Sequence, residues 1–135
     1  MGISVTTERN GTLRQQVQVD SFESFVTDAP LEFGGEASAP DAHDHFDLSL
    51  GVCKADDCDH LCTAQGTSLQ GVTAHVLRDD SKERQGIYRL DVTLTFHGIE
   101  DEASAKRLHE ITDRCPIHRL MTASQVEITS HVDLA

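Results

Sequence analysis

The sequence is short of aromatic residues. Its 135 residues include five Phe, one Tyr and no Trp. Aromatic side chains bury the largest apolar area per residue, so a chain with so few of them builds only a modest hydrophobic core. A chain of this length is expected to form one domain, residues 1–135. The small core favours association with a partner subunit.

Positive charge is also scarce. Eleven Lys and Arg face 23 Asp and Glu, which gives a formal net charge of −12 and a pI near 4.8. Proteins that bind nucleic acid present clustered Lys and Arg to the phosphates and release counterions from them. The composition therefore predicts no nucleic-acid partner.

Long apolar runs are absent. No segment approaches the roughly 20 apolar residues of a membrane helix. The first eight residues lack the basic and apolar regions of a signal peptide. We therefore expect a cytoplasmic protein that binds no membrane, in which the four cysteines are mostly reduced at rest.

The first part of the chain has the pattern of short strands. Residues 3–8 and 12–19 alternate loosely between apolar and polar side chains on either side of Asn10-Gly11, a strong hairpin signal. Residues 22–28 predict a third strand. The segment 29–40 contains two prolines and two adjacent glycines, which predict a loop.

A long helix is expected after this loop. It begins just after Pro40, where Asp41 is a plausible N-cap and the carboxylate of Asp44 suits the positive end of the helix dipole. It runs to about Gln65, where Gly66 ends it.

The rest of the chain alternates strands with one more helix. Residues 70–79 and 86–97 predict a second hairpin, and a helix opens at 100–102 and is stopped near Cys115 by Pro116. A closing strand is expected at 126–132. The order βββ-α-ββ-α-β indicates an α+β fold with mostly antiparallel strands.

Two of the four cysteines stand in distinctive settings. Cys53 lies inside the predicted long helix, and Cys115 directly precedes Pro116 after the second helix. These settings predict a thiol pair that the fold assembles, and hence cysteine redox chemistry. The alternative is a pair of inert core cysteines.

Short motifs spread over nearly the whole chain carry a resemblance to a known family. They are Gly34-Gly35, Ala39-Pro40, Leu50-Gly51-Val52-Cys53, Gly66 with Leu69, Gly71 and Val72, Cys115-Pro116-Ile117-His118-Arg119 and Val126-Glu127-Ile128. Together they resemble the OsmC/Ohr family. The resemblance implies two intertwined subunits around long central helices, and a peroxidase that reduces organic hydroperoxides with two cysteines in oxidative-stress defence.

The resemblance also implies roles for individual residues. Cys53 would be the peroxidatic cysteine and Cys115 the resolving one. Arg9 resembles the family's activating arginine, while the position of the carboxylate that holds it is occupied by His43 or Asp44. We assign that role to Asp44. No bound cofactor is implied, and an external dithiol, of lipoyl type or another small thiol, would recycle the disulfide.

The residues after Cys53 depart from the family pattern. Family peroxidases carry an apolar run there, whereas this chain is polar from Lys54 onwards. Asp57 lies one helical turn from Cys53 and His60 about two turns away. A carboxylate beside a thiol raises its pKa unless a cation offsets it. Cys53 is then either less reactive than in its relatives or accepts a more polar substrate.

Five residues are assigned to substrate contacts. They are Phe46, Leu50, Asp57, His60 and His118. For His118 the alternative is simple packing beside Pro116.

A metal site is the alternative for the remaining cysteines. Cys58 and Cys62 are four residues apart and share one helix face, as metal ligands can, and His60 lies between them. Otherwise both are small buried side chains packed against the sheet. The alternative functions are therefore a redox-sensing or metal-binding protein of the same fold, and a binding module without thiol reactivity.

Overall fold

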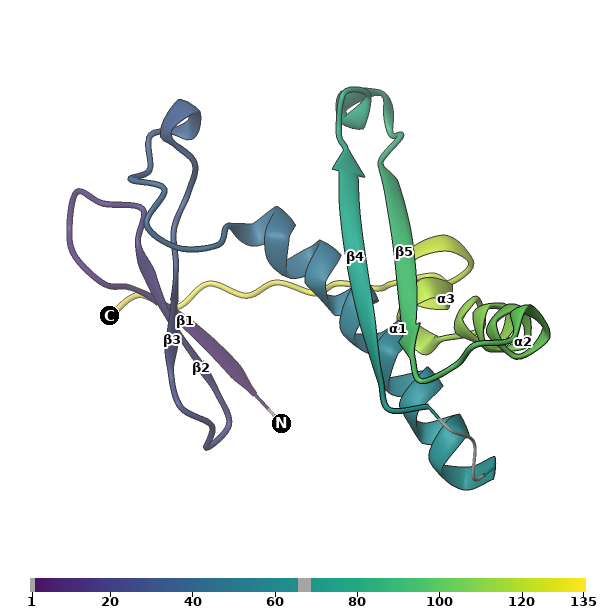
Figure 1. Cartoon of the computed structure of the whole chain (residues 1–135). Coiled ribbons are helices and arrows are strands. Elements are labelled where there is room, and N and C mark those ends of the chain that lie inside the picture. The colour runs from purple at the N-terminus through teal and green to yellow at the C-terminus, as the bar shows by residue number, and fades with distance from the viewer. Residues whose placement is uncertain (1, 66–68) are drawn as a thin grey trace. The chain divides into compact units, whose positions relative to one another are not determined.

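The chain forms two compact units with separate sheets. The computed structural model describes residues 2–65 and 69–135, with the backbone alone for residues 59 and 61–65. One unit extends to Leu48 and the other begins at Ser49. Each contains one antiparallel sheet, and helix α1 (Ala42–Gln65) contributes to both (Figure 1). No helix within these described residues is long and apolar enough to cross a membrane.

The first unit is built on three short strands. Strands β1 (Ile3–Thr7), β2 (Gln15–Val19) and β3 (Phe25–Thr27) pair in the order β1-β2-β3. Val5 pairs with Val17, and the Val17 side chain is buried. The predicted first three strands are confirmed with shorter bounds.

The long helix begins where the sequence predicts. The backbone N–H of Asp44 donates to the Asp41 carboxylate at 2.8 Å, and the N–H of Asp41 donates to the Asp44 carboxylate at 2.9 Å. This reciprocal pair satisfies two amides that the helix itself leaves without partners. The predicted N-cap at Asp41 is confirmed. The predicted stop at Gly66 lies outside the described residues.

The second unit packs α1 against a two-stranded sheet. Strands β4 (Gly71–Asp79) and β5 (Arg89–His97) are antiparallel, and alternate side chains on one face are half-buried. A Cβ placed on Gly51 would lie 3.1 Å from the Val76 side chain, so glycine lets α1 approach β4 closely. Helix α2 (Glu102–Thr112) adds Leu108 to the same core.

The segment after α2 differs from the prediction. Helix α2 ends at Thr112, and a further helix, α3 (Pro116–Thr122), follows it. Pro116 begins this helix, because proline lacks only an N–H that the first helical turn leaves unpaired anyway. The Cys115 side chain caps it by accepting a hydrogen bond from the His118 N–H at 3.4 Å.

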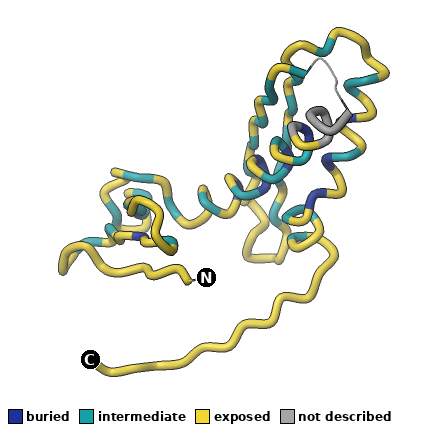
Figure 2. Tube along the Cα trace, turned by 90° about the horizontal axis from the view of Figure 1, so that it is seen from below, coloured by how far each residue is buried: buried dark blue, intermediate teal, exposed yellow. Residues whose placement is uncertain are grey.

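The predicted closing strand at 126–132 is wrong for the isolated chain. Residues 124–135 follow α3 without regular structure and are exposed (Figure 2). A strand needs a neighbour for its backbone hydrogen bonds, and no strand of the described chain pairs with this segment. Its apolar side chains are exposed, with Ile128 at 84% and Val132 at 87%.

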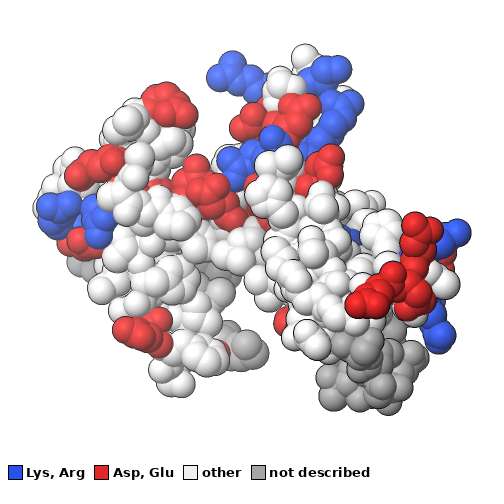
Figure 3. Space-filling model, viewed as in Figure 1, with Lys and Arg blue, Asp and Glu red and all other residues white. Residues whose placement is uncertain are grey.

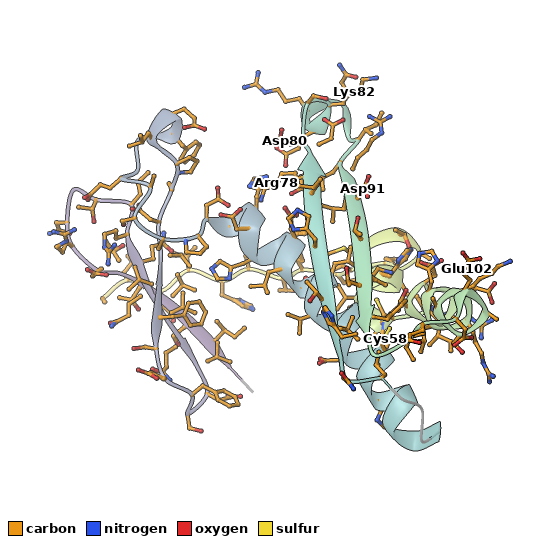
Figure 4. All side chains as sticks on the ribbon, viewed as in Figure 1. Cys58, Arg78, Asp80, Lys82, Asp91 and Glu102 are labelled. Carbon is orange, nitrogen blue, oxygen red and sulfur yellow. The ribbon has the colours of Figure 1, made fainter. Side chains whose placement is uncertain are left out.

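Basic residues concentrate at the turn of the β4–β5 hairpin. Figure 3 shows Lys and Arg side chains gathered there among acidic ones. The basic residues are Lys82 and Arg84 in the turn, with Arg78 and Arg89 at the strand ends that flank it. Arg78 and Lys82 are labelled in Figure 4 beside Asp80 and Asp91. Opposite charges therefore alternate on this surface.

Candidate functional site

The structure brings the two predicted thiols together. Cys53 lies on α1 and Cys115 at the N-terminus of α3. Their Sγ atoms and a carboxylate oxygen of Asp57 all lie within 4.8 Å of one another. The two cysteines are reduced and not bridged. A disulfide needs about 2.05 Å between the sulfurs, so a modest approach would close one.

Both sulfur atoms accept hydrogen bonds from the first turn of α3. The His118 N–H donates to Cys115 Sγ at 3.4 Å, and the Ile117 N–H donates to Cys53. A helix of this kind leaves its first amides without internal partners, and here sulfur satisfies two of them. Such donors favour a negatively charged sulfur.

Other features of the site oppose ionisation of Cys53. Burial raises the pKa of the Cys53 thiol, the Ile117 N–H lowers it, and the neighbouring Cys115 and Asp57 raise it again. The net result is a pKa above the ordinary thiol value. These contacts therefore oppose formation of the Cys53 thiolate, and a cation beside the sulfur would favour it.

A buried lysine stands next to Cys53 in the sequence. The Lys54 residue is 4% exposed, and its Nζ donates to the Thr112 carbonyl oxygen at 2.8 Å. Nζ also lies 3.0 Å from His118 Nδ1 and 3.6 Å from the Asp113 carboxylate. The Thr112 carbonyl accepts the Cys115 N–H as well, at 3.3 Å. Lys54 thus links α1 to the segment that carries Cys115.

The predicted substrate-contact residues fall into separate places. Asp57 lies beside the thiols, whereas Leu50 and His118 line a cavity of about 190 Å³. His60 is exposed. Phe46 is 42% exposed and belongs to the first unit.

The predicted activating pair belongs to the first unit. Arg9 is exposed and lies 3.6 Å from the Glu36 carboxylate. Asp44 takes part in the reciprocal cap of α1. The catalytic roles of Arg9 and Asp44 stay predictions.

Among the described residues, Cys58 and His60 of the alternative metal set belong to no group with the spacing of metal ligands. Cys58, which is labelled in Figure 4, is fully buried. It belongs to one apolar core with Leu108. The side chain of Cys62 lies outside the described residues, and His60 is exposed. A different group, Cys53 with Asp57 and Cys115, has the spacing of metal ligands.

Sequence analysis missed the role of Lys54. Leu50, Lys54 and Cys58 follow one another at intervals of four, so they share a helix face. Leu50 and Cys58 are both buried. A lysine on a buried helix face needs hydrogen-bond acceptors and a counter-charge nearby. The position of Lys54 between two apolar residues of this face was therefore the signal that could have predicted its contacts.

The comparisons with known proteins agree with the sequence motifs. A family model described as OsmC-like protein matches residues 35–131. No curated protein sequence matches the chain.

Solved structures share the fold at low sequence identity. One is an osmotic stress induced and detoxification response protein of Psychrobacter arcticus, with a TM-score of 0.72, 22% identity and coverage of 87% of this chain and 85% of the other. The OsmC-like protein of Mycoplasma pneumoniae has a TM-score of 0.70 and 15% identity, with coverage of 90% of this chain and 86% of the other. The organic hydroperoxide resistance protein OhrB of Bacillus subtilis has a TM-score of 0.61 and 16% identity, with coverage of 90% of each chain.

Proposed function

Because the chain belongs to the OsmC-like protein family, we propose that it is a thiol peroxidase that reduces organic hydroperoxides through Cys53 and Cys115. The observation that carries the proposal is the presence of both sulfur atoms within 4.8 Å of each other. The similar Bacillus subtilis structure, named for organic hydroperoxide resistance, supports the substrate class.

The proposed reaction uses both sulfurs. The Cys53 thiolate attacks the terminal oxygen of the hydroperoxide, the O–O bond breaks, and the departing alkoxide takes a proton to become an alcohol. Cys53 is then a sulfenic acid. The Cys115 sulfur attacks it, water leaves, and a disulfide forms. The hydroperoxide is reduced by two electrons and the thiol pair is oxidised by two.

The disulfide must be reduced by an external dithiol. A lipoyl-type or other small dithiol would attack one sulfur, pass through a mixed disulfide and leave oxidised, with both protein thiols restored. No bound cofactor takes part in this scheme.

Activation of Cys53 requires a cation because its pKa is raised. We assign this role to Arg9, with Asp44 as the carboxylate that orients it. The polar residues after Cys53, Asp57 foremost, favour a hydroperoxide more polar than a long alkyl chain.

The protein is proposed to act as a homodimer in the cytoplasm. Val126, Ile128, Val132 and Leu134 stand at even positions of the exposed C-terminal segment and are 64–96% exposed. Side chains with this period line one face of a strand. A second copy would supply the neighbouring strand that the segment lacks in the isolated chain. Sedimentation of the full chain and of a chain ending at residue 123 tests this, and an unchanged monomer in both contradicts it.

The peroxidase proposal is tested by mass spectrometry of the reduced protein after one equivalent of cumene hydroperoxide. The expected product is a Cys53–Cys115 disulfide together with one equivalent of cumyl alcohol. The Cys115→Ser protein should accumulate sulfenic or over-oxidised Cys53. The Cys53→Ser protein should consume no hydroperoxide.

Cys58→Ser serves as the matched control, because Cys58 lies in the apolar core and does not belong to the cluster of Cys53, Asp57 and Cys115. It should retain the reaction, provided its circular dichroism spectrum matches that of the wild type. Unchanged thiols in the wild-type protein after minutes, with the hydroperoxide intact, contradict the proposal.

A metal site is a second candidate function. Cys53, Asp57 and Cys115 offer two sulfur atoms and one oxygen at suitable spacing for Zn²⁺, which binds such ligands. Zinc titration followed by calorimetry should give one site per chain that Cys115→Ser abolishes. Binding that survives Cys115→Ser but is lost in Cys62→Ser would instead support the predicted Cys58, Cys62 and His60 set.

A further inference from the structure

A cavity lies in the second unit between α1, β5 and the end of α2. Its volume is about 190 Å³. The apolar wall consists of Leu50 from α1 and Leu90, Val92 and Leu94 from β5. Among the described residues that line it, neither Cys53 nor Cys115 occurs. The cavity is therefore distinct from the thiol pair.

The polar part of the cavity lining consists of Lys54, the three residues that it contacts, and His109. An ammonium group has three N–H donors. Lys54 donates to the Thr112 carbonyl at 2.8 Å and to His118 Nδ1 at 3.0 Å. The Asp113 carboxylate lies 3.6 Å from Nζ, beyond hydrogen-bond distance, and balances the positive charge. The cavity offers no uncompensated charge to an ionic ligand.

The Lys54 contact fixes the tautomer of His118. Because an ammonium group can only donate, Nδ1 of His118 must accept, and the neutral ring then carries its proton on Nε2. Nε2 makes no hydrogen bond to the described part of the chain. It is also not among the fully buried polar atoms that lack a partner. His118 lines the cavity. Its Nε2–H is the ring donor that the Lys54 contact leaves unused.

We infer that this cavity binds a compact, neutral and mostly apolar molecule that carries one hydrogen-bond acceptor, such as an aryl ketone. The four aliphatic side chains would contact its apolar body, and the Nε2–H of His118 would donate to its acceptor. An apolar cavity of about 150 Å³ accommodates benzene, so the volume here fits a benzene ring with a small carbonyl substituent. This binding site goes beyond the proposed peroxidase function and does not depend on it.

Titration of the Cys53→Ser protein with acetophenone, followed by methyl and ring-nitrogen NMR, tests the inference. This variant removes the proposed reaction, so binding and peroxidase activity are judged separately. Saturable shifts are expected at the methyl groups of Leu50, Leu90 and Leu94 and at the His118 ring. The ring nitrogens should report the Nε2–H tautomer before and after binding. Absence of saturable shifts at these groups overturns the inference.

A second probe isolates the hydrogen bond. In α-methylstyrene a CH₂ group replaces the carbonyl oxygen of acetophenone at nearly the same shape. A hydrogen bond contributes about 1 kcal/mol, so α-methylstyrene should bind about fivefold more weakly. His118→Phe should remove this difference. Equal affinity of both probes for the Cys53→Ser protein overturns the assigned donor.

Filling the cavity provides the steric test. Leu94→Phe places a larger ring in the space and should abolish the shifts, and Val92→Leu, which adds one methylene, serves if Leu94→Phe fails to fold. Leu77→Phe is the matched control, because Leu77 is 58% exposed on the other face of the hairpin. It should leave affinity unchanged. Shifts that persist in a folded cavity-filling variant overturn the inference.

Discussion

Replacing Asp57 by Asn should increase the reactivity of Cys53. The Asp57 carboxylate and Cys53 Sγ lie within 4.8 Å, and the negative charge of Asp57 is one of the causes that raise the pKa of Cys53. Asn has nearly the same size and removes the charge. The pKa of Cys53 should therefore fall, and more of this thiol should ionise at pH 7.

The size of the effect follows from the separation. Two unit charges 4.8 Å apart interact by about 0.9 kcal/mol in water and by about 3.5 kcal/mol at an effective dielectric constant of about 20. Loss of the repulsion of about 0.9 kcal/mol alone would raise the thiolate population of Cys53 about fourfold. A thiol of lower pKa is intrinsically less nucleophilic, which offsets nearly half of the gain on a logarithmic scale. The expected increase in rate is about twofold to about twentyfold.

The assay is alkylation of Cys53 by iodoacetamide at pH 7, quantified by peptide mass spectrometry in a Cys115→Ser background. Asp91→Asn is the matched control, because it removes one negative charge from the outer face of β5 (Figure 4). It should change the rate little. An alkylation rate that Asp57→Asn leaves unchanged, or an equal gain from Asp91→Asn, would refute the electrostatic reasoning.

Three further predictions concern stability. The side-chain hydrogen bond from Ser38 is the main cause that lowers the pKa of Asp28 from 3.8 to about 2, so stability present above pH 4 should be lost as the pH falls towards 2. Thermal unfolding across this range should show a smaller loss in Asp28→Asn. Asp101→Ala removes the cap of α2 and should lower the free energy of unfolding in urea by about 1 kcal/mol. Gly35→Ala should lower it by about 2 kcal/mol or more in the same assay, because the new Cβ would overlap the Ala29 carbonyl group.

Local patterns predicted most of the fold. The Asn10-Gly11 turn, the cap at Asp41 and the alternation along 89–97 each depend on neighbouring residues, and the corresponding elements formed. The failures were at 116–122 and 126–132. Pro116 was interpreted as a stop although it also suits a helix start, and the closing strand depends on a partner that local sequence does not specify.

The candidate site was predictable only in part. The motifs around Cys53 and Cys115 predicted the pair, and helical spacing predicted that Asp57 would lie close to Cys53. The contacts of Lys54 with Thr112 and His118 could not be predicted, because they join segments that are distant in the sequence. Their geometry depends on the tertiary fold.

The first turn of α3 has a consequence for the oxidised state. Its amides at Ile117 and His118 donate to the two sulfurs of the reduced pair. A disulfide needs about 2.05 Å between the sulfurs, so closing it must move at least one sulfur relative to its donor. Oxidation should therefore weaken at least one of these hydrogen bonds and speed solvent exchange of the amide hydrogen that makes it, while amides in the middle of β5 keep their rates. Exchange at these two amides would then report the redox state of the pair without any added label.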